Sequence, residues 1–322
     1  MRLFDRSHAD ARALLASGAP VYLSVNPVEY HGPHLPLHND RLVSAGLVRD
    51  LHARVAAGRG DWPLLEADDL EVGVEPAPGQ GTRHTPFLVV KELVREACRS
   101  LAELGATKVV IMTFHGSPLH SLAIERGIEL LAARGVAAVA PFNALMRELL
   151  EVDGTRYAEA FAHIEDRAER DEMMRDLALD FHAGFFETSM TLHYAPEAVS
   201  PCHRELLPCP PITPHAGLAR AAGIARRAGA ATLARELDTA ANGMGWFALR
   251  PFPGYTGCPH RATAAAGAIF ARHIVDRFAE VTLAVLDGTA RSPAPIMAWS
   301  SALTMNGRFA PFGGTRAIPV SA

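Results

Sequence analysis

Histidine and acidic side chains are concentrated in one short segment near the N-terminus, Val28 to Asp40, which reads VEYHGPHLPLHND. Glu29 and His31 are separated by one residue, so in an extended segment both side chains point to the same side. Two prolines restrict the turn that follows, which allows Asp40 to return to the same place. Two carboxylates and an imidazole form a mixed oxygen and nitrogen ligand set suited to Zn²⁺, Mn²⁺ or Fe²⁺. The alternative for Asp40 is a helix N-cap.

Three more polar residues that would suit such a site occur later in the chain. His115 directly follows the apolar run KVVIMTF, and His182 and Glu187 lie together in FHAGFFETSM. Each has a structural alternative: His115 as a polar residue at the end of a strand, and Glu187 in the first turn of a helix, where acidic residues are favoured. Their joint occurrence with the Val28 to Asp40 segment favours a shared site.

Apolar, β-branched runs alternate with helical patterns along the first half of the chain. The predicted strands occupy residues 20–25, 64–74, 108–113 and 136–140. The predicted helices between them occupy residues 41–57, 87–104 and 119–134. This alternation predicts an α/β fold with a mostly parallel sheet and helices on both faces. Ligands bind beyond the carboxyl ends of the strands in such sheets, and both Glu29 and His115 lie just past a predicted strand end.

The second half of the chain shows weaker patterns. Residues 147–180 are rich in charged and helix-favouring residues, which indicates a helical insertion. It would form a cap or an oligomer contact, or would be a solvated surface helix. Helices are also predicted over 215–241 and 262–286. Residues 292–322 show no clear periodicity and are interpreted as an extended tail. We therefore predict one domain over residues 1–290, with the insertion at 147–180, followed by a C-terminal extension over 291–322.

Composition excludes several classes of protein. The chain has 322 residues, a formal net charge of −4, 49% hydrophobic and 20% charged residues, values typical of an ordinary globular protein. No long basic run is present, so no nucleic-acid partner is expected. No apolar stretch approaches the roughly 20 residues of a membrane span, so no membrane association is expected.

Four cysteines do not demand a disulfide framework, and a cytoplasmic location is the expectation. A zinc cluster of Cys202, Cys209 and Cys258 with neighbouring histidines lacks paired C-x-x-C spacing. Small buried thiols are the favoured interpretation of these cysteines.

Four segments of the chain resemble the creatininase (creatinine amidohydrolase) family. Residues 29–40 match the motif E-x-H-G-x-H-L-P-L-x-x-D, and residues 182–189 match H-A-G-E-x-E-T-S except at Phe185. Residues 113–118 match the family's N-G-H-G-G-N only weakly, and residues 254–264 match a late G-x-x-G-x-P-x-x-A-T-A. Order and spacing agree over about residues 15–290, and the first and third motifs are quite specific.

The resemblance implies a three-layer α/β/α fold, a metal-dependent amidohydrolase and a homo-oligomer, which is a hexamer in several family members. It also implies two divalent metal ions, Zn, Mn or Fe, bridged by Asp40. The implied metal ligands are Glu29, His31, Asp40, His115 and Glu187. His182 and Glu187 are the implied catalytic residues, with His182 giving a proton to the leaving nitrogen. Creatininase itself has a ligating glutamate where this chain has Ser117, so Glu187 must substitute for it or the second ion binds weakly. Phe185 replaces an acidic residue of the family motif, and binding of a single ion is therefore the alternative.

Three further residues are assigned to substrate binding: His38, Ser117 and Trp246. The alternative for His38 is a partly exposed group beside the ligands, and the segment GMGWF around Trp246 is either a substrate lid or a buried turn. The expected reaction is hydrolysis of a small-molecule amide, a linear amide, formamide, lactam or small peptide, by hydroxide that divalent metal ions make available. The alternative is a catalytically impaired member that serves as a metal- or ligand-binding oligomer.

Overall fold

A parallel four-stranded sheet forms the centre of the computed structural model, which describes residues 1–60, 62–305 and 308. Its strands, in the order β2-β1-β3-β4, are β2 (Leu65–Leu70), β1 (Val21–Val25), β3 (Lys108–Met112) and β4 (Ala137–Val139). All four predicted strands are confirmed, each one to five residues shorter than expected.

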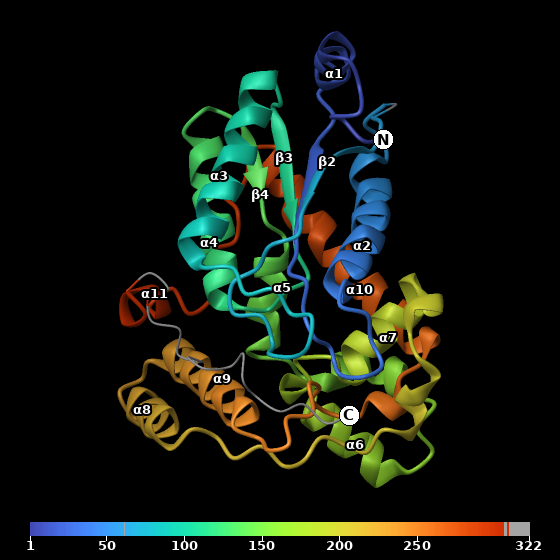
Figure 1. Ribbon diagram of the computed structural model, residues 1–322, viewed down its shortest axis with the longest axis vertical. Coiled ribbons are helices and arrows are strands. Elements are labelled where there is room, and N and C mark those ends of the chain that lie inside the picture. The colour runs from blue at the N-terminus through green and yellow to red at the C-terminus, as the bar shows by residue number, and fades with distance from the viewer. Residues whose placement is uncertain (61, 306–307, 309–322) are drawn as a thin grey trace.

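Helices cover both faces of the sheet (Figure 1). One layer contains α3 (Phe87–Leu104) and α4 (Pro118–Ala132), and the opposite layer contains α2 (Asn39–Ala56) and α10 (Ala264–Leu286). The three-layer α/β/α fold expected from the sequence is therefore confirmed.

Side chains of the two central strands, β1 and β3, alternate between two separate cores. On β1, Leu23 packs among residues of α3 and α4, whereas Tyr22 packs among residues of α2 and α10. On β3, Ile111 and Val110 divide in the same way. Because successive side chains of a strand point to opposite faces, a strand buried on both faces needs an uninterrupted apolar run, as in KVVIM.

The remaining helices lie mostly beyond the carboxyl ends of the strands, in the lower half of Figure 1. They are α1 (His8–Leu15), α5 (Phe142–Leu149), α6 (Arg167–Arg175), α7 (Phe185–Tyr194), α8 (Ala216–Arg227), α9 (Ala231–Phe247) and α11 (Ser300–Leu303). Short 3-10 helices occur at Gly154–Phe161, Leu177–Leu179, Pro196–Ala198, Pro201–Glu205 and Pro259–Arg261. In the part of the chain that the structure describes, no helix is both long and apolar enough to cross a membrane.

The structure changes the expected secondary structure of the second half. Residues 147–180 contain α6, which buries no side chain, and two 3-10 helices. The 3-10 helices place Phe161 and Leu177 in the core shared with α2 and α10. The predicted helix over 215–241 is two helices that pack on each other, α8 and α9. The tail contains α11, and residues 306–307 and 309–322 lie outside the described part. The domain boundary at 290 and the interpretation of 147–180 as an insertion stay predictions.

Helices α7 and α10 approach each other so closely that a glycine is required between them. A Cβ atom at Gly267 of α10 would collide with the backbone carbonyl of Ser189 on α7. This contact supports the site, because α7 also carries Glu187. A glycine of α8, Gly223, has open space where its Cβ would be.

We expect Gly267→Ala to lower the free energy of unfolding by about 1–3 kcal/mol, because the added methyl group must push two helices apart. Gly223→Ala is the matched control and should raise it by about 0.5–1 kcal/mol, as alanine does in an unobstructed helix. Urea titration of both variants measures the difference, and equal stability of the two would contradict the assigned contact.

Candidate metal centre

The loop between β1 and α2 places Glu29, His31 and Asp40 in one buried spot beyond the carboxyl end of the sheet. A hydrogen bond from Glu29 N to Leu37 O (2.9 Å) closes this loop. Gly32 turns the loop with a φ of 68°, a conformation that side chains rarely adopt. Asp40 lies in the first turn of α2, but neither of its oxygens accepts from a backbone N–H, and the residue at the N-cap is His38. The N-cap alternative for Asp40 is therefore wrong.

His115, which follows β3, joins this spot from the neighbouring strand. His31 Nε2 lies 2.9 Å from Asp40 Oδ1, and His115 Nδ1 lies 2.9 Å from Glu29 Oε2 and 3.6 Å from Asp40 Oδ2. All four side chains are buried. The two oxygens of Asp40 thus face two different imidazoles, which is the arrangement expected of a carboxylate between two cations.

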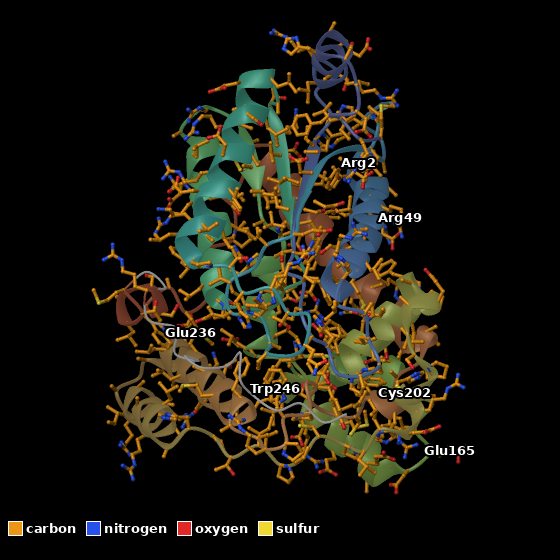
Figure 2. All side chains as sticks on the ribbon, in the orientation of Figure 1. Arg2, Arg49, Glu165, Cys202, Glu236 and Trp246 are labelled. Carbon is orange, nitrogen blue, oxygen red and sulfur yellow. The ribbon has the colours of Figure 1, made fainter. Side chains whose placement is uncertain are left out.

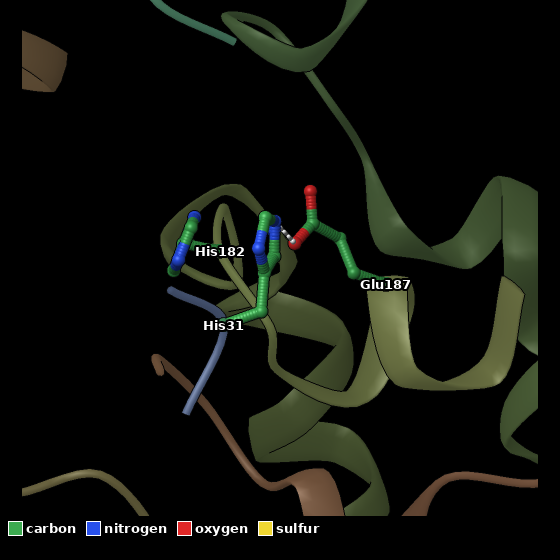
Figure 3. A group of neighbouring side chains, drawn as sticks. All are labelled: His31, His182 and Glu187. Atoms are coloured by element: carbon green, nitrogen blue, oxygen red, sulfur yellow. Dashed lines mark ion pairs between the residues drawn. The ribbon is translucent and has the colours of Figure 1, made fainter. Parts of the chain in front are cut away.

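His182 and Glu187 complete the cluster from the start of α7. Ala183 has a φ of 48°, and this tight turn lets its N–H donate to Glu187 Oε2 at 2.5 Å. Figure 3 shows the result: Glu187 Oε2 lies 3.7 Å from His31 Nε2, and the rings of His31 and His182 stack with centroids 4.3 Å apart. Glu187 is therefore both a residue of the first helical turn and a member of the cluster.

Backbone carbonyls determine which nitrogen of each histidine faces the carboxylates. His31 Nδ1 lies 3.1 Å from Glu29 O, His115 Nε2 lies 2.9 Å from Val74 O, and His182 Nε2 lies 3.0 Å from Tyr30 O. A carbonyl oxygen only accepts, so each of these nitrogens donates. In a neutral imidazole the other nitrogen then presents its lone pair to the cluster.

The donor set fits a divalent metal ion. Glu29 Oε2 and both oxygens of Asp40 are buried, and the polar groups that face them are imidazole nitrogens of His31 and His115, which donate only when they are protonated. Leaving such oxygens unpaired is costly, and lone pairs of imidazole beside them would add repulsion. Two sets of three residues have ligand atoms that all lie within 4.8 Å of one another. One set is Glu29, His31 and Asp40, and the other is His31, His182 and Glu187.

Protons take the place of cations when none is bound. Burial disfavours charge on His31 and His115, but the surrounding carboxylates outweigh it and raise their pKa values to about 10 and about 9. Burial raises the pKa of Glu187 to about 8. Burial and the nearby His31 lower the pKa of His182 to about 3, so this imidazole is neutral. The cluster therefore binds positive charge in one form or the other.

A cavity of about 380 Å³ opens from the cluster. Ser117 and Trp246 line it, as expected of substrate-binding residues. Trp246 lies in the last turn of α9, is buried, and its ring centroid is 5.0 Å from that of His182. Its segment is therefore helical and is not a turn, and the alternative of a substrate lid stays a prediction. His38 does not line the cavity, and its Nδ1 lies 3.9 Å from Glu71 Oε1.

Two acidic residues that the sequence reasoning missed also line the cavity, Glu75 and Asp180. Ser117 Oγ donates to Glu75 Oε2 at 3.2 Å, so a carboxylate from another loop stands beside the serine. Burial raises the pKa of Glu75 to about 7. Glu75 follows β2, which runs parallel to β1 and β3 and ends at the same edge of the sheet. Its position after a strand was therefore the signal that could have identified it. Asp180 accepts hydrogen bonds from the first N–H groups of α7, a role that its sequence position alone does not show.

The remaining candidates lie elsewhere. Cys202, Cys209 and Cys258 are free and partly buried. Among the residues with described side chains, the groups that are close enough to hold a metal ion contain no cysteine. His34 donates to or accepts from Thr188 Oγ1 through its Nε2 at 2.9 Å, which ties the loop after β1 to α7.

Comparisons with known proteins place this geometry in context. The fold is similar to that of a creatininase mutant of the Zn-Zn type, with 18% identity, 87% of this chain and 95% of that chain covered, and a TM-score of 0.56. The manganese creatininase structure shows 19% identity, coverage of 87% and 96%, and a TM-score of 0.55. A crystal structure of creatinine amidohydrolase shows 18% identity, coverage of 87% and 95%, and a TM-score of 0.54.

These structural similarities concern the fold, and no curated protein matches the sequence. The family model described as creatininase, creatinine amidohydrolase, matches residues 5–282. The matched region includes every residue of the cluster. The chain belongs to the creatininase family.

Proposed function

We propose that this protein is a metal-dependent amidohydrolase that cleaves a non-peptide or small-peptide C–N bond, in a linear amide, a formamide or a lactam. The observation that supports this most directly is Asp40, whose two oxygens are buried and face two different imidazoles. In the reaction the oxygen of water adds to the amide carbon, the C–N bond breaks, and the leaving nitrogen takes a proton.

Two divalent ions would be held by two sets of residues that share Asp40. Glu29, His115 and Asp40 would hold one ion, and His31, Glu187 and Asp40 would hold the other. The mixed nitrogen and oxygen donors suit Zn, Mn or Fe. When bound, such ions lower the pKa of water and polarise an amide carbonyl.

In this proposal, His182 moves the proton. Its Nε2 is held by Tyr30 O, and its Nδ1 lies 3.9 Å from Glu29 Oε1 beside the cavity. The imidazole is neutral and its Nδ1 carries a lone pair, which would accept the proton from water and then deliver it to the leaving nitrogen. Trp246 packs on His182 and limits the positions that its ring can adopt.

Asp40→Asn should remove most of the bound metal and abolish turnover, because the amide cannot serve as an anionic ligand for two cations. We expect elemental analysis of dialysed protein to give two ions per chain for the wild type and less than one for the variant. Asp276→Asn is the control, because this carboxylate lies on the surface of α10 and pairs with Arg54. Full metal content in Asp40→Asn would refute the site.

His182→Gln should retain both ions and lower kcat by about 10²–10⁴-fold, the usual contribution of a positioned acid–base group. The measurement pairs metal content with steady-state hydrolysis of a formamide panel. If one ion is lost, His182 is a ligand; if kcat is unchanged, it carries no proton. Either result would end the assignment of a proton shuttle.

Metal binding should release protons, and its affinity should rise with pH. The folded pKa values of His31, His115 and Glu187, about 10, 9 and 8, lie above those of the free side chains, so the metal-free chain holds extra protons at pH 7. The protonation of these three side chains therefore stabilises the folded metal-free protein at pH 6, and this stabilisation is lost as the pH rises towards 10. Titration calorimetry with Mn²⁺ in buffers of different ionisation enthalpy counts the released protons; a count of zero would contradict this account.

A further inference from the structure

The wall of the cavity away from the cluster is almost entirely apolar. Phe142, Leu145 and Met146 of α5 form one side, and Trp246 and Phe247 of α9 form another. The volume of about 380 Å³ lies within the range of pockets that bury drug-sized ligands. A substrate as small as formamide would leave most of this apolar surface in contact with water.

Away from the cluster, no cationic side chain of the described residues lines the cavity. The described residues that line it include no lysine or arginine, whereas Glu75 and Asp180 add two acidic groups beyond the cluster. A carboxylate or phosphate on the part of a substrate distant from the metals would find no cationic partner there. The cavity therefore suits a neutral or cationic body.

A segment outside the family match completes the apolar wall. Ile296, Met297, Trp299 and Leu303 line the cavity, although the family model ends at residue 282. Side chains of α5 hold the start of this segment: Asn143 Nδ2 donates to Pro293 O at 3.0 Å and Arg147 Nε to Ala294 O at 2.9 Å.

Glu236 of α9 holds the rest of the segment with both carboxylate oxygens. Oε1 accepts from Met297 N at 2.9 Å and Oε2 from Trp299 Nε1 at 2.7 Å. Figure 2 shows Glu236 and Trp246 towards opposite ends of α9, so one helix links this anchor with the ring beside His182. A buried carboxylate with both oxygens used in this way holds the segment as a built part of the cavity.

We propose that residues 292–304 form the specificity-determining wall of the cavity, and that the substrate is a neutral or cationic amide that carries a bulky apolar, ring-containing group. This inference rests on the proposed amidohydrolase function. The reacting amide lies at the cluster, and the apolar group fills the space between α5, α9 and Trp299.

Two readouts test the wall. The first is binding of the neutral dye N-phenyl-1-naphthylamine to metal-free protein, followed by fluorescence, which needs no hydrolysis. The second is turnover by metal-loaded protein of N-(1-naphthyl)formamide, N-methylformamide and the anionic 4-formamido-1-naphthoic acid. We expect the wild type to bind the dye and to hydrolyse the neutral naphthyl compound at least about tenfold more efficiently than either of the others.

Trp299→Ala should weaken dye binding and raise KM for the naphthyl formamide by about tenfold, with kcat and the metal content unchanged. Phe4→Ala, which truncates an aromatic residue exposed far from the cavity, is its control. Glu236→Gln should act in the same direction. The amide nitrogen that replaces one carboxylate oxygen is a donor, so one of the two N–H groups loses its acceptor. Glu280→Gln, on the surface of α10, is the control for that charge change.

Two patterns of failure are distinct. If no amide is hydrolysed but dye binding still depends on Trp299, the proposed function is wrong and the apolar wall stands. If amides are hydrolysed while Trp299→Ala binds the dye as tightly as the wild type, or N-methylformamide and the anionic compound are preferred, this inference is overturned and the proposed function stands.

Discussion

Carboxylates and imidazole lone pairs that converge in a buried place demand positive charge, and much of this structure follows from that demand. Glu29 and Asp40 are almost wholly removed from water, and three of their oxygens face imidazole nitrogens that donate only when they are protonated. Removing one ionised carboxylate from water costs several kcal/mol even after relaxation, and a pair side by side costs more. Such a cluster is stable only with protons or metal ions bound to it.

The parallel sheet makes that convergence possible. β1 and β3 are neighbours and end at the same edge, so the residues that follow them, Glu29 and His115, meet although they are far apart in the chain. α7 reaches the same edge through its contact with α10 and supplies Glu187. Backbone carbonyls of the connecting loops then orient each imidazole, because a donor on one ring nitrogen leaves the lone pair on the other. The packing of the layers brings the candidate ligands together, and the loops orient their side chains.

The same edge of the sheet combines a polar cluster with an apolar cavity. In the proposed reaction, water activation needs charge and holding a bulky substrate needs apolar surface, and different segments would supply the two. The loops after the strands provide the acids and imidazoles. Helices α5 and α9 and the segment around Trp299 provide the apolar surface. This division allows the wall to vary without changes to the cluster.

Local sequence patterns by themselves determined much of this picture. The apolar runs indicated the central strands β1 and β3, because a strand buried on both faces needs uninterrupted apolar residues. The E-x-H spacing and the motifs around His115 and Glu187 indicated the cluster. Tertiary structure alone decided three other points: that Glu75 stands beside Ser117, that His38 turns away to Glu71, and that Trp299 reaches the cavity. The physical reason is that a strand or a helix repeats with a period written in neighbouring residues. A contact between loops far apart in the chain depends instead on how whole layers pack, and no local pattern encodes it.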